Sequence, residues 1–277
     1  MLALVLSGCG AVRLAYDQGP TLTSWWLSSR IDLDEAQSNR VREALDDVFA
    51  WHRRTQLPLY AEWLARNRQA AEGAVDAAAM CVAADEVRGW LDPVVGRLVP
   101  HVADLATRLN ATQVDAFARR LARETDKRVR QARERTSEQA AEAAAGRLAD
   151  RFETFYGPLE PVQRGWIEEA TRVDAQAAGL RDALRRQRRE AAGVEGLRRI
   201  VTGRLTGDQA LQAAREAAEL LLRVPEDEAA AALTRAQRQR QCELAARLHA
   251  AATPTQRRHL LDQLRDWEND ARKLSRR

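Results

Sequence analysis

The chain has 277 residues, of which 45% are hydrophobic and 30% charged, and its formal net charge is +4. This length allows one large domain or two ordinary ones. The composition excludes a disordered chain, a collagen-like chain and a disulfide-dense mini-protein. After the first residues no apolar run approaches the roughly 18 residues of a membrane span, which excludes a polytopic membrane protein.

The first ten residues are apolar or small and contain a cysteine. Leu6-Ser7-Gly8-Cys9 resembles the lipobox of bacterial lipoproteins, in which an aliphatic residue and two small residues precede a cysteine. The resemblance implies cleavage before Cys9 and attachment of lipid, including palmitate, to its sulfur. Three acyl chains, each stabilised by about 0.8 kcal/mol per buried CH₂, would hold the protein on a membrane without a spanning helix. The alternative is a frayed apolar N-terminus with a free thiol.

A signal peptide has a positively charged start and an apolar stretch of roughly 7–15 residues. No Lys or Arg precedes Cys9, and the apolar stretch is shorter. We therefore expect residues 1–8 to be the end of a longer signal peptide, and residues 9–20 to be a lipid-anchored tether. In enteric-type bacteria an Asp after the lipidated cysteine retains lipoproteins in the inner membrane. Gly10 stands there, which favours the periplasmic face of the outer membrane.

Almost everything after residue 20 is predicted to be helical, because alanine is abundant, β-branched residues are few, and no segment alternates with period two. We expect an all-α, elongated protein with antiparallel helical hairpins. The predicted helices span about 20–30, 34–56, 58–71, 84–108, 111–156, 161–190, 194–203, 206–223, 226–251 and 254–275. Pro93 and Pro100 are expected to break or kink the fourth of them.

A helix-start pattern recurs five times along the chain. Each copy has a polar residue at the N-cap and Gln at the third helical position, the spacing of a capping box. The N-cap and Gln positions are Asp34 and Gln37, Asn110 and Gln113, Glu160 and Gln163, Thr206 and Gln209, and Thr253 and Gln256.

The predicted helix over 111–156 is unusually long. It has large apolar residues at both ends and a charged, alanine-rich middle, as in a helix that bridges two packed ends. We expect a tryptophan-rich helical lobe over 21–108 and an Ala/Arg-rich helical hairpin lobe over 109–277.

Five of the seven tryptophans lie in the first third of the chain. Trp25 and Trp26 follow Cys9 closely, so they are candidates for an interfacial membrane anchor or a binding groove. The alternative, which we favour for the set, is that the tryptophans fill the core of an alanine-rich protein.

Trp51, His52, Arg53 and Arg54 form the densest polar segment, and together with Trp25 and Trp26 they are the possible binding residues. A histidine near carboxylates could perform acid–base chemistry, and Glu43, Asp46 and Asp47 lie one to two turns earlier. The alternative, which we favour, is that His52 and Arg53 tie the end of one helix to the next. We therefore assign no catalytic residue.

Metal and cofactor binding are not expected. The four histidines do not have metal-ligand spacing, and no Cys-x-x-Cys, phosphate-binding glycine loop or Gly-x-Ser-x-Gly is present. Cys81 and Cys242 could pair in an oxidising periplasm or remain buried free thiols. Residues 119–135 and 181–204 each carry a net charge of +5. We interpret both as solvated faces, and a periplasmic address excludes nucleic acid as a partner.

Several motifs resemble a family of uncharacterised proteobacterial lipoproteins. They are the lipobox, Trp25-Trp26, Leu33-Asp34-x-x-Gln37, Trp51-His52-Arg53-Arg54-Thr55-x-Leu57-Pro58 and Phe152-x-x-Phe155-Tyr156-Gly157-x-Leu159-x-x-x-Gln163. The resemblance covers Cys9 to about residue 170. It implies an all-helical envelope protein without known activity.

A looser similarity is to the periplasmic Spy and CpxP proteins, through the Leu-Thr-x-x-Gln segments at Leu205 and Leu233. We expect an envelope lipoprotein with a non-catalytic binding or structural role, an envelope protein or the cell wall being possible partners. One alternative is a Spy-like, ATP-independent chaperone or envelope-stress protein. Another is a cell-wall or lipid enzyme that uses His52.

Overall fold

The computed structural model describes residues 8–223 and 225–277, and in these ranges it is all-helical without a strand. The helices are α1 (Gly8–Asp17), α2 (Gly19–Ser28), α3 (Glu35–Ala70), α4 (Ala77–Gly89), α5 (Leu91–Ala106), α6 (Ala111–Glu134), α7 (Ser137–Tyr156), α8 (Pro161–Arg172), α9 (Ala175–Thr202), α10 (Gly207–Leu222), α11 (Glu228–Ala250) and α12 (Pro254–Ser275). The all-α prediction is confirmed. The expected signal-peptide remnant, residues 1–8, lies almost entirely outside the described residues.

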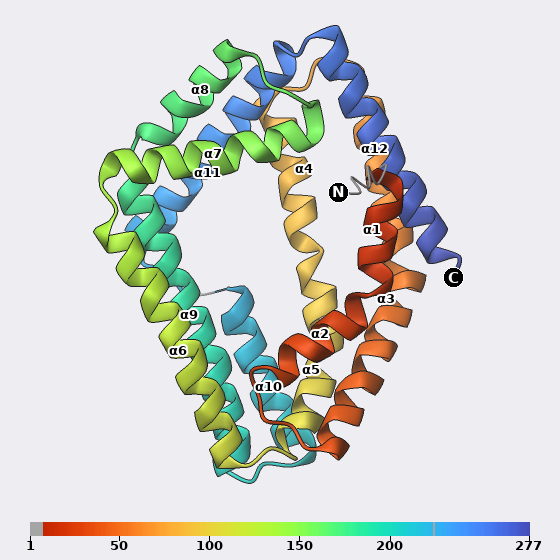
Figure 1. Ribbon diagram of the computed structural model, residues 1–277, viewed down its shortest axis with the longest axis vertical. Coiled ribbons are helices and arrows are strands. Elements are labelled where there is room, and N and C mark those ends of the chain that lie inside the picture. Colours follow the sequence, from red (N-terminus) through yellow and green to blue (C-terminus); the bar gives the residue numbers. More distant parts are fainter. Residues whose placement is uncertain (1–7, 224) are drawn as a thin grey trace, which may run out of the picture.

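The helices trace an elongated ring in Figure 1. Packing proceeds from α3 to α12, then to α7, α9, α10 and α5, and α5 returns to α3. Helix α6 lies beside α9, helix α8 packs on α7, and α4 crosses the middle of the view to contact α11. Because α3 packs on α12 and α5 on α10, contacts cross the expected lobe boundary between residues 108 and 109.

The apolar core is divided into four clusters, as expected when many helices of modest apolar width pack in pairs. One lies among α5, α9 and α10 around Ile200, and another among α7, α8 and α11 around Ile167. The third joins α3, α7 and α12 around Leu264. The fourth lies around Val114 where the chain enters α6.

The predicted single helix over 111–156 is wrong, because the chain ends α6 at Glu134 and starts α7 at Ser137. Thr136 accepts a hydrogen bond from Gln139 N at 3.2 Å, and Gln139 Oε1 accepts from Thr136 N at 3.1 Å. This capping box satisfies the free N–H groups of a new helix. It has the same spacing as the five predicted helix starts and was overlooked among the charged residues.

Other boundaries differ for local reasons. Pro58 lies inside α3, so 34–56 and 58–71 are one helix. The segment 84–108 divides at Trp90, the cap between α4 and α5, and its two prolines lie within α5. Asp174 has a left-handed φ of 55°, which ends α8 at Arg172, and α9 then continues through the expected break near 191–193. The expected tether over 9–20 is helical, in α1 and the start of α2.

Four of the five predicted helix starts have the third-position Gln bonded back to the N-cap backbone. The Gln Oε1 accepts from the N-cap N–H of Asp34, Asn110, Glu160 and Thr253 at 2.9–3.0 Å. Thr206 is the exception, since it makes no side-chain cap bond and is followed by Gly207 with a φ of 51°.

Candidate functional site

The segment around His52 binds the N-terminal helix to the body of the protein. His52 Nδ1 lies 2.8 Å from the Tyr16 hydroxyl of α1. Arg53 lies 3.3 Å from the Asp17 carboxylate and stacks over the Tyr16 ring at 5.4 Å. Two of the predicted binding residues therefore join the middle of α3 to α1, rather than the end of one helix to the next as expected.

Further contacts hold the same inner face of α1 and α2. Arg277 lies 2.6 Å from Asp17, and Arg13 lies 3.1 Å from the buried carboxylate of Asp270 on α12. Burial raises the pKa of Asp270, and the charge of Arg13 opposes this rise. A Cβ on Gly19 would lie 2.6 Å from the Phe49 ring, so glycine allows the close approach of α2 to α3.

His52 lies in a group of aromatic rings. Its ring centroid is 5.7 Å from Tyr16 and 5.4 Å from Tyr60, and Tyr60 stacks on Trp90 at 4.0 Å. Burial lowers the pKa of His52. The imidazole is therefore neutral near pH 7, and its Nδ1 and the Tyr16 hydroxyl share a hydrogen bond.

Asp47, one of the carboxylates expected near His52, binds His101 instead. Asp47 lies 2.9 Å from His101 Nε2 and 2.7 Å from Arg97, both on α5. Hydrogen bonds from Arg97 and His101 hold the pKa of Asp47 below its usual value. The sequence analysis missed this cluster, although Arg97 and His101 are four residues apart and so share one helix face.

The remaining predicted binding residues are spread over two helices. Trp25 and Trp26 on α2 are exposed, so the expectation that the tryptophans fill the core is wrong for these two. Trp51 is half-buried beside His52, and Arg54 is exposed. Cys9, the expected lipidation site, is the second residue of α1. The structure thus places Cys9 and both tryptophans in the first two helices.

His249 is the most enclosed histidine of the described chain, and the sequence analysis did not single it out. It is 1% exposed, and its Nε2 lies 2.9 Å from Gly73 O. A carbonyl only accepts, so Nε2 carries a proton. Nδ1 lies 3.1 Å from the Tyr156 hydroxyl. With both ring nitrogens bonded inside the protein, His249 joins α11 to α7 and to the loop after α3.

The basic stretches are balanced by acids from neighbouring helices. In the first, Arg128 is paired with Glu190 at 2.6 Å. In the second, Arg198 is paired with Asp115 at 3.2 Å and Arg199 with Glu216 at 2.6 Å. These ion pairs link α6, α9 and α10 and support the interpretation of solvated helix faces.

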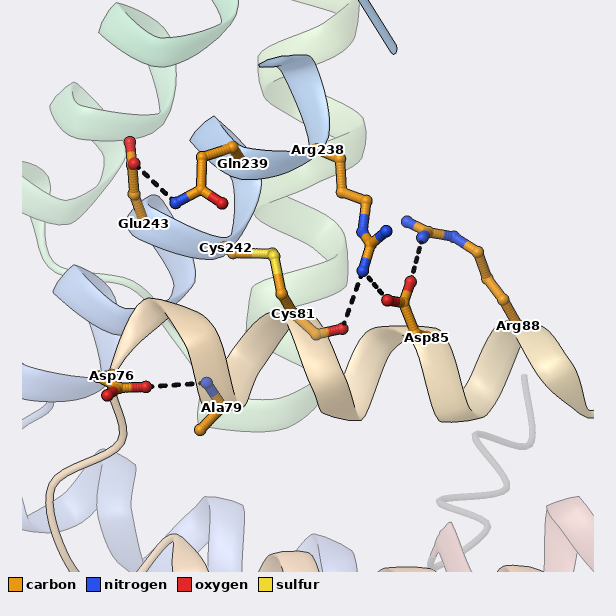
Figure 2. Close-up of a disulfide and its surroundings, with 9 residues drawn as sticks. All are labelled: Asp76, Ala79, Cys81, Asp85, Arg88, Arg238, Gln239, Cys242 and Glu243. Atoms are coloured by element: carbon orange, nitrogen blue, oxygen red, sulfur yellow. Dashed lines mark hydrogen bonds and ion pairs between the residues drawn. A yellow bond between two sulfur atoms is a disulfide. The ribbon is translucent and has the colours of Figure 1, made fainter. Parts of the chain in front are cut away.

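Cys81 and Cys242 form a disulfide between α4 and α11, which closes a sequence separation of 161 residues (Figure 2). Arg238 is one turn before Cys242 and donates to the carbonyl oxygen of Cys81 at 3.4 Å and to the Asp85 carboxylate. The bond and this ion pair together attach α4, whose residues are otherwise partly or fully exposed, to α11.

An open groove of about 790 Å³ lies between α7 and α8, and its lining includes Ala145, Gly146, Ile167, Glu138 and Arg172. In the described ranges no group of three or more His, Cys, Asp or Glu residues could hold a metal ion. No helix among residues 8–223 and 225–277 has the length and apolar character needed to cross a bilayer.

The fold and its junctions define an all-helical protein whose polar clusters tie helices together. Residues 29–203 match a family of unknown function, DUF6279. The match covers more than half of the chain, and the protein belongs to this family. No curated protein and no solved structure matches the chain.

Proposed function

We propose that this protein is a bacterial envelope lipoprotein, acylated at Cys9 and facing the periplasm from the outer membrane. Its helical body has a binding or structural role rather than a catalytic one. The Leu6-Ser7-Gly8-Cys9 segment supports the anchor, and Gly10 after the cysteine supports the outer membrane. Membership of a family of unknown function is compatible with this role.

The disulfide between Cys81 and Cys242 is the observation that carries the proposal. Disulfides persist in oxidising compartments such as the periplasm and are rare in the cytosol, where thiols are kept reduced. Two of the three cysteines of the chain are thus used by an oxidised cross-link. The remaining cysteine, Cys9, is the one in the lipobox.

The use of the polar residues supports a non-catalytic role. His52 and Arg53 are engaged with Tyr16 and Asp17, and His249 is bonded at both ring nitrogens. Asp47 is held by Arg97 and His101. These groups position helices, and an all-helical frame of this kind offers its surface to a partner in the envelope or the cell wall.

The anchor is tested by metabolic labelling with a palmitate analogue and by membrane fractionation of cells that express the full chain from its own gene. The wild-type protein should incorporate label and sediment with the outer membrane. The Cys9→Ser variant should lose both properties, whereas the Cys81→Ser/Cys242→Ser variant should remain labelled. An unlabelled wild-type protein, or a Cys9→Ser protein that is labelled equally, would refute the proposal.

The compartment is tested separately by trapping thiols in intact cells with a membrane-permeant maleimide reagent. Cys81 and Cys242 should be protected until a reductant is added. Immediate modification of both residues would place them in a reducing compartment and would contradict the proposed address, whatever the labelling of Cys9.

A further inference from the structure

The outer face of α1 and α2 carries four exposed large apolar residues. Leu14 and Leu22 are each 57% exposed, Trp25 is 70% exposed and Trp26 is 46% exposed. Gln18 N bonds to Leu14 O at 3.0 Å and Leu22 N to Gln18 O at 2.9 Å, so the helical ladder continues across the junction of the two helices. Leu14 is eight residues before Leu22, and Leu22 is three and four residues before Trp25 and Trp26, spacings that place the four side chains toward one side of a helix.

This face lacks charge in a chain that is otherwise rich in it. Residues 14–29 contain one ionisable carboxylate or base, Asp17, although 30% of the whole chain is charged. Asp17 is turned inward, where Arg53 and Arg277 bind it. The other side chains between Leu14 and Ser29 are apolar, small, hydroxyl-bearing or amide-bearing, apart from Tyr16 against His52.

The opposite face of the same helices is fixed to the body. The contacts of Arg13, Tyr16 and Asp17 with α3 and α12 define its orientation, and Gly19 closes against Phe49. In Figure 1, α2 runs diagonally from the end of α1; α1 packs on α12 and α2 packs on α3. The apolar row is therefore presented outward by a rigid support.

We propose that the face formed by Leu14, Leu22, Trp25 and Trp26 lies in the lipid–water interface of the bilayer that holds the acylated Cys9. Tryptophan is enriched at this depth, where its ring is shielded and its N–H remains hydrated. An uncharged helix face with leucine and tryptophan binds there without spanning the membrane. The face is a second membrane contact, which sets the orientation of the helical body, and the inference rests on the proposed lipid anchor.

The position of Cys9 at the start of α1 favours a bilayer as the partner of this face. Cys9 is five residues before Leu14 on the same helix, a rise of about 8 Å. Acyl chains on its sulfur would bring the start of α1 to the membrane surface, and the fixed orientation of α1 would bring the row with it. Arg30 marks the far border, with its guanidinium 4.4 Å from the Trp26 ring and 3.2 Å from Glu124. A protein partner is the competing outcome of the test.

The test uses the unacylated full chain coupled through Cys9 to a maleimide-bearing phospholipid. Because Cys81 and Cys242 are joined to each other, Cys9 is the one thiol available for coupling. The vesicles consist of phosphatidylethanolamine and phosphatidylglycerol, with or without a brominated lipid that quenches tryptophan at the interface. The comparison is between the parent chain and the Trp25→Ser/Trp26→Ser variant. Trp166→Phe is the matched control, since it removes a tryptophan from α8, whose ring lies under Arg247.

Brominated lipid should quench the tryptophan fluorescence of the parent protein and of Trp166→Phe. It should not quench that of the Trp25→Ser/Trp26→Ser variant. A Leu22→Ser variant should show reduced quenching with both tryptophans still present. Absence of quenching in the parent, or equal quenching in the double variant, would overturn the proposal and favour a protein partner for this face. Because chemical coupling replaces acylation in this experiment, it tests the membrane contact of the apolar face even if Cys9 is not acylated in cells.

Discussion

Gln37 and Gln113 hydrogen-bond to each other across the starts of two helices, with Gln113 Nε2 2.7 Å from Gln37 Oε1. Each is the third residue of its helix. Each also donates to the backbone that leads to the partner helix, Gln37 to Arg108 O at 2.7 Å and Gln113 to Asp32 O at 2.6 Å. The side chains that cap α3 and α6 therefore also join them.

Gln163 and Gln256 repeat this arrangement at the starts of α8 and α12. Gln256 Nε2 lies 2.8 Å from Gln163 Oε1 and 2.8 Å from Pro158 O, while Gln163 Nε2 lies 3.2 Å from Ala251 O. All four glutamines are buried. A capping box is usually a local device, but here two boxes share their amides and set the position of one helix start against another.

The first prediction concerns these glutamine pairs. Gln256→Ala removes the partner of the Pro158 carbonyl and of the buried Gln163 amide, and should lower the free energy of unfolding by about 2–4 kcal/mol, because an unsatisfied buried group is costly. Gln139→Ala removes a capping glutamine whose side chain is exposed, and should cost about 1 kcal/mol or less. Urea unfolding measures both. Equal costs for the two variants would contradict the structural role of the pair.

A double-mutant cycle provides a second, independent test of the same pair. The single variants Gln163→Ala and Gln256→Ala each lose the shared amide bonds, whereas the double variant loses these bonds once. The combined destabilisation should therefore be smaller than the sum by about 1–2 kcal/mol. Strict additivity would mean that the two side chains act separately.

The second prediction concerns the tyrosines. Burial raises the pKa of Tyr16 and of Tyr156 to about 12, and it also raises the pKa of Tyr60. An exposed tyrosine titrates near 10, so the folded state holds these protons more tightly than the unfolded state. Their contribution to stability is fully present below about pH 10 and is lost as the pH rises through 12. Phenolate absorbance should appear at a higher pH in the native protein than in urea.

The three tyrosines are the complete set in the chain, so the absorbance has no other phenolic source. Tyr156→Phe should reduce the amplitude of the alkaline transition, and it should also destabilise the fold at neutral pH, since His249 Nδ1 loses its donor. Titration of the native protein near pH 10, with its helical circular dichroism intact, would contradict the buried environment of these rings.

Much of the helical layout follows from local rules that the sequence displays. The N-caps at Asp34, Asn110 and Thr253 were predicted because a polar residue followed three positions later by Gln has the spacing of a capping box. What could not be predicted was that Gln37 and Gln113 would share their amides, since that depends on which helix starts meet in space. The residue spacing predicted each capping box but not which second glutamine its side chain would contact.

The predicted boundaries that were wrong have physical causes beyond local pattern. The box at Thr136 was hidden because apolar residues further along suggested one continuous helix. The helices predicted over 34–56 and 58–71 are one, because Leu57 and Ala61 around Pro58 are buried and packing holds α3 together across the N–H that proline lacks. The sequence does not reveal that Asp174 ends α8, because the left-handed conformation is one of several that an aspartate can adopt.

The candidate site was predictable in its residues but not in its contacts. His52 and Arg53 stood out by density. They were expected at the end of one helix, tying it to the next, but they lie inside α3 and contact the earlier helix α1. Their partners, Tyr16 and Asp17, lay in a segment expected to be a tether, so the geometry was out of reach. The exposure of Trp25 also departs from the average behaviour of tryptophan, which says nothing about an individual position.

The third prediction concerns the attachment of α1. In the Tyr16→Phe/Asp17→Ala variant, His52 loses its hydroxyl partner and both Arg53 and Arg277 lose their carboxylate. These contacts are half-exposed, so the global free energy of unfolding should fall only slightly. Hydrogen exchange of residues 8–28 should nevertheless accelerate, because local opening of a helix depends on its own contacts.

Thr21→Ala, an exposed change on α2, is the matched control and should leave the exchange of both helices unaltered. If α1 and α2 exchange at the same rate in the Tyr16→Phe/Asp17→Ala variant as in the parent, then the aromatic and ionic contacts around His52 do not hold them. In that case the orientation of the apolar row would have to come from the remaining contacts, such as the Arg13–Asp270 pair and the packing of α2 on α3.

The last prediction concerns the disulfide. A cross-link over 161 residues strongly restricts the unfolded chain, and such loops give about 2–5 kcal/mol of stabilisation. Reduction of the wild-type protein should therefore lower the midpoint of urea unfolding, and the Cys81→Ser/Cys242→Ser variant should match the reduced protein with or without reductant. Cys9→Ser must keep the full response to reductant.

Helix α4 should open first in the reduced protein, because its remaining ties to α11 are polar contacts such as Arg238 with Asp85. Exchange of α4 that is unchanged on reduction would show that the cross-link is not what fastens this helix.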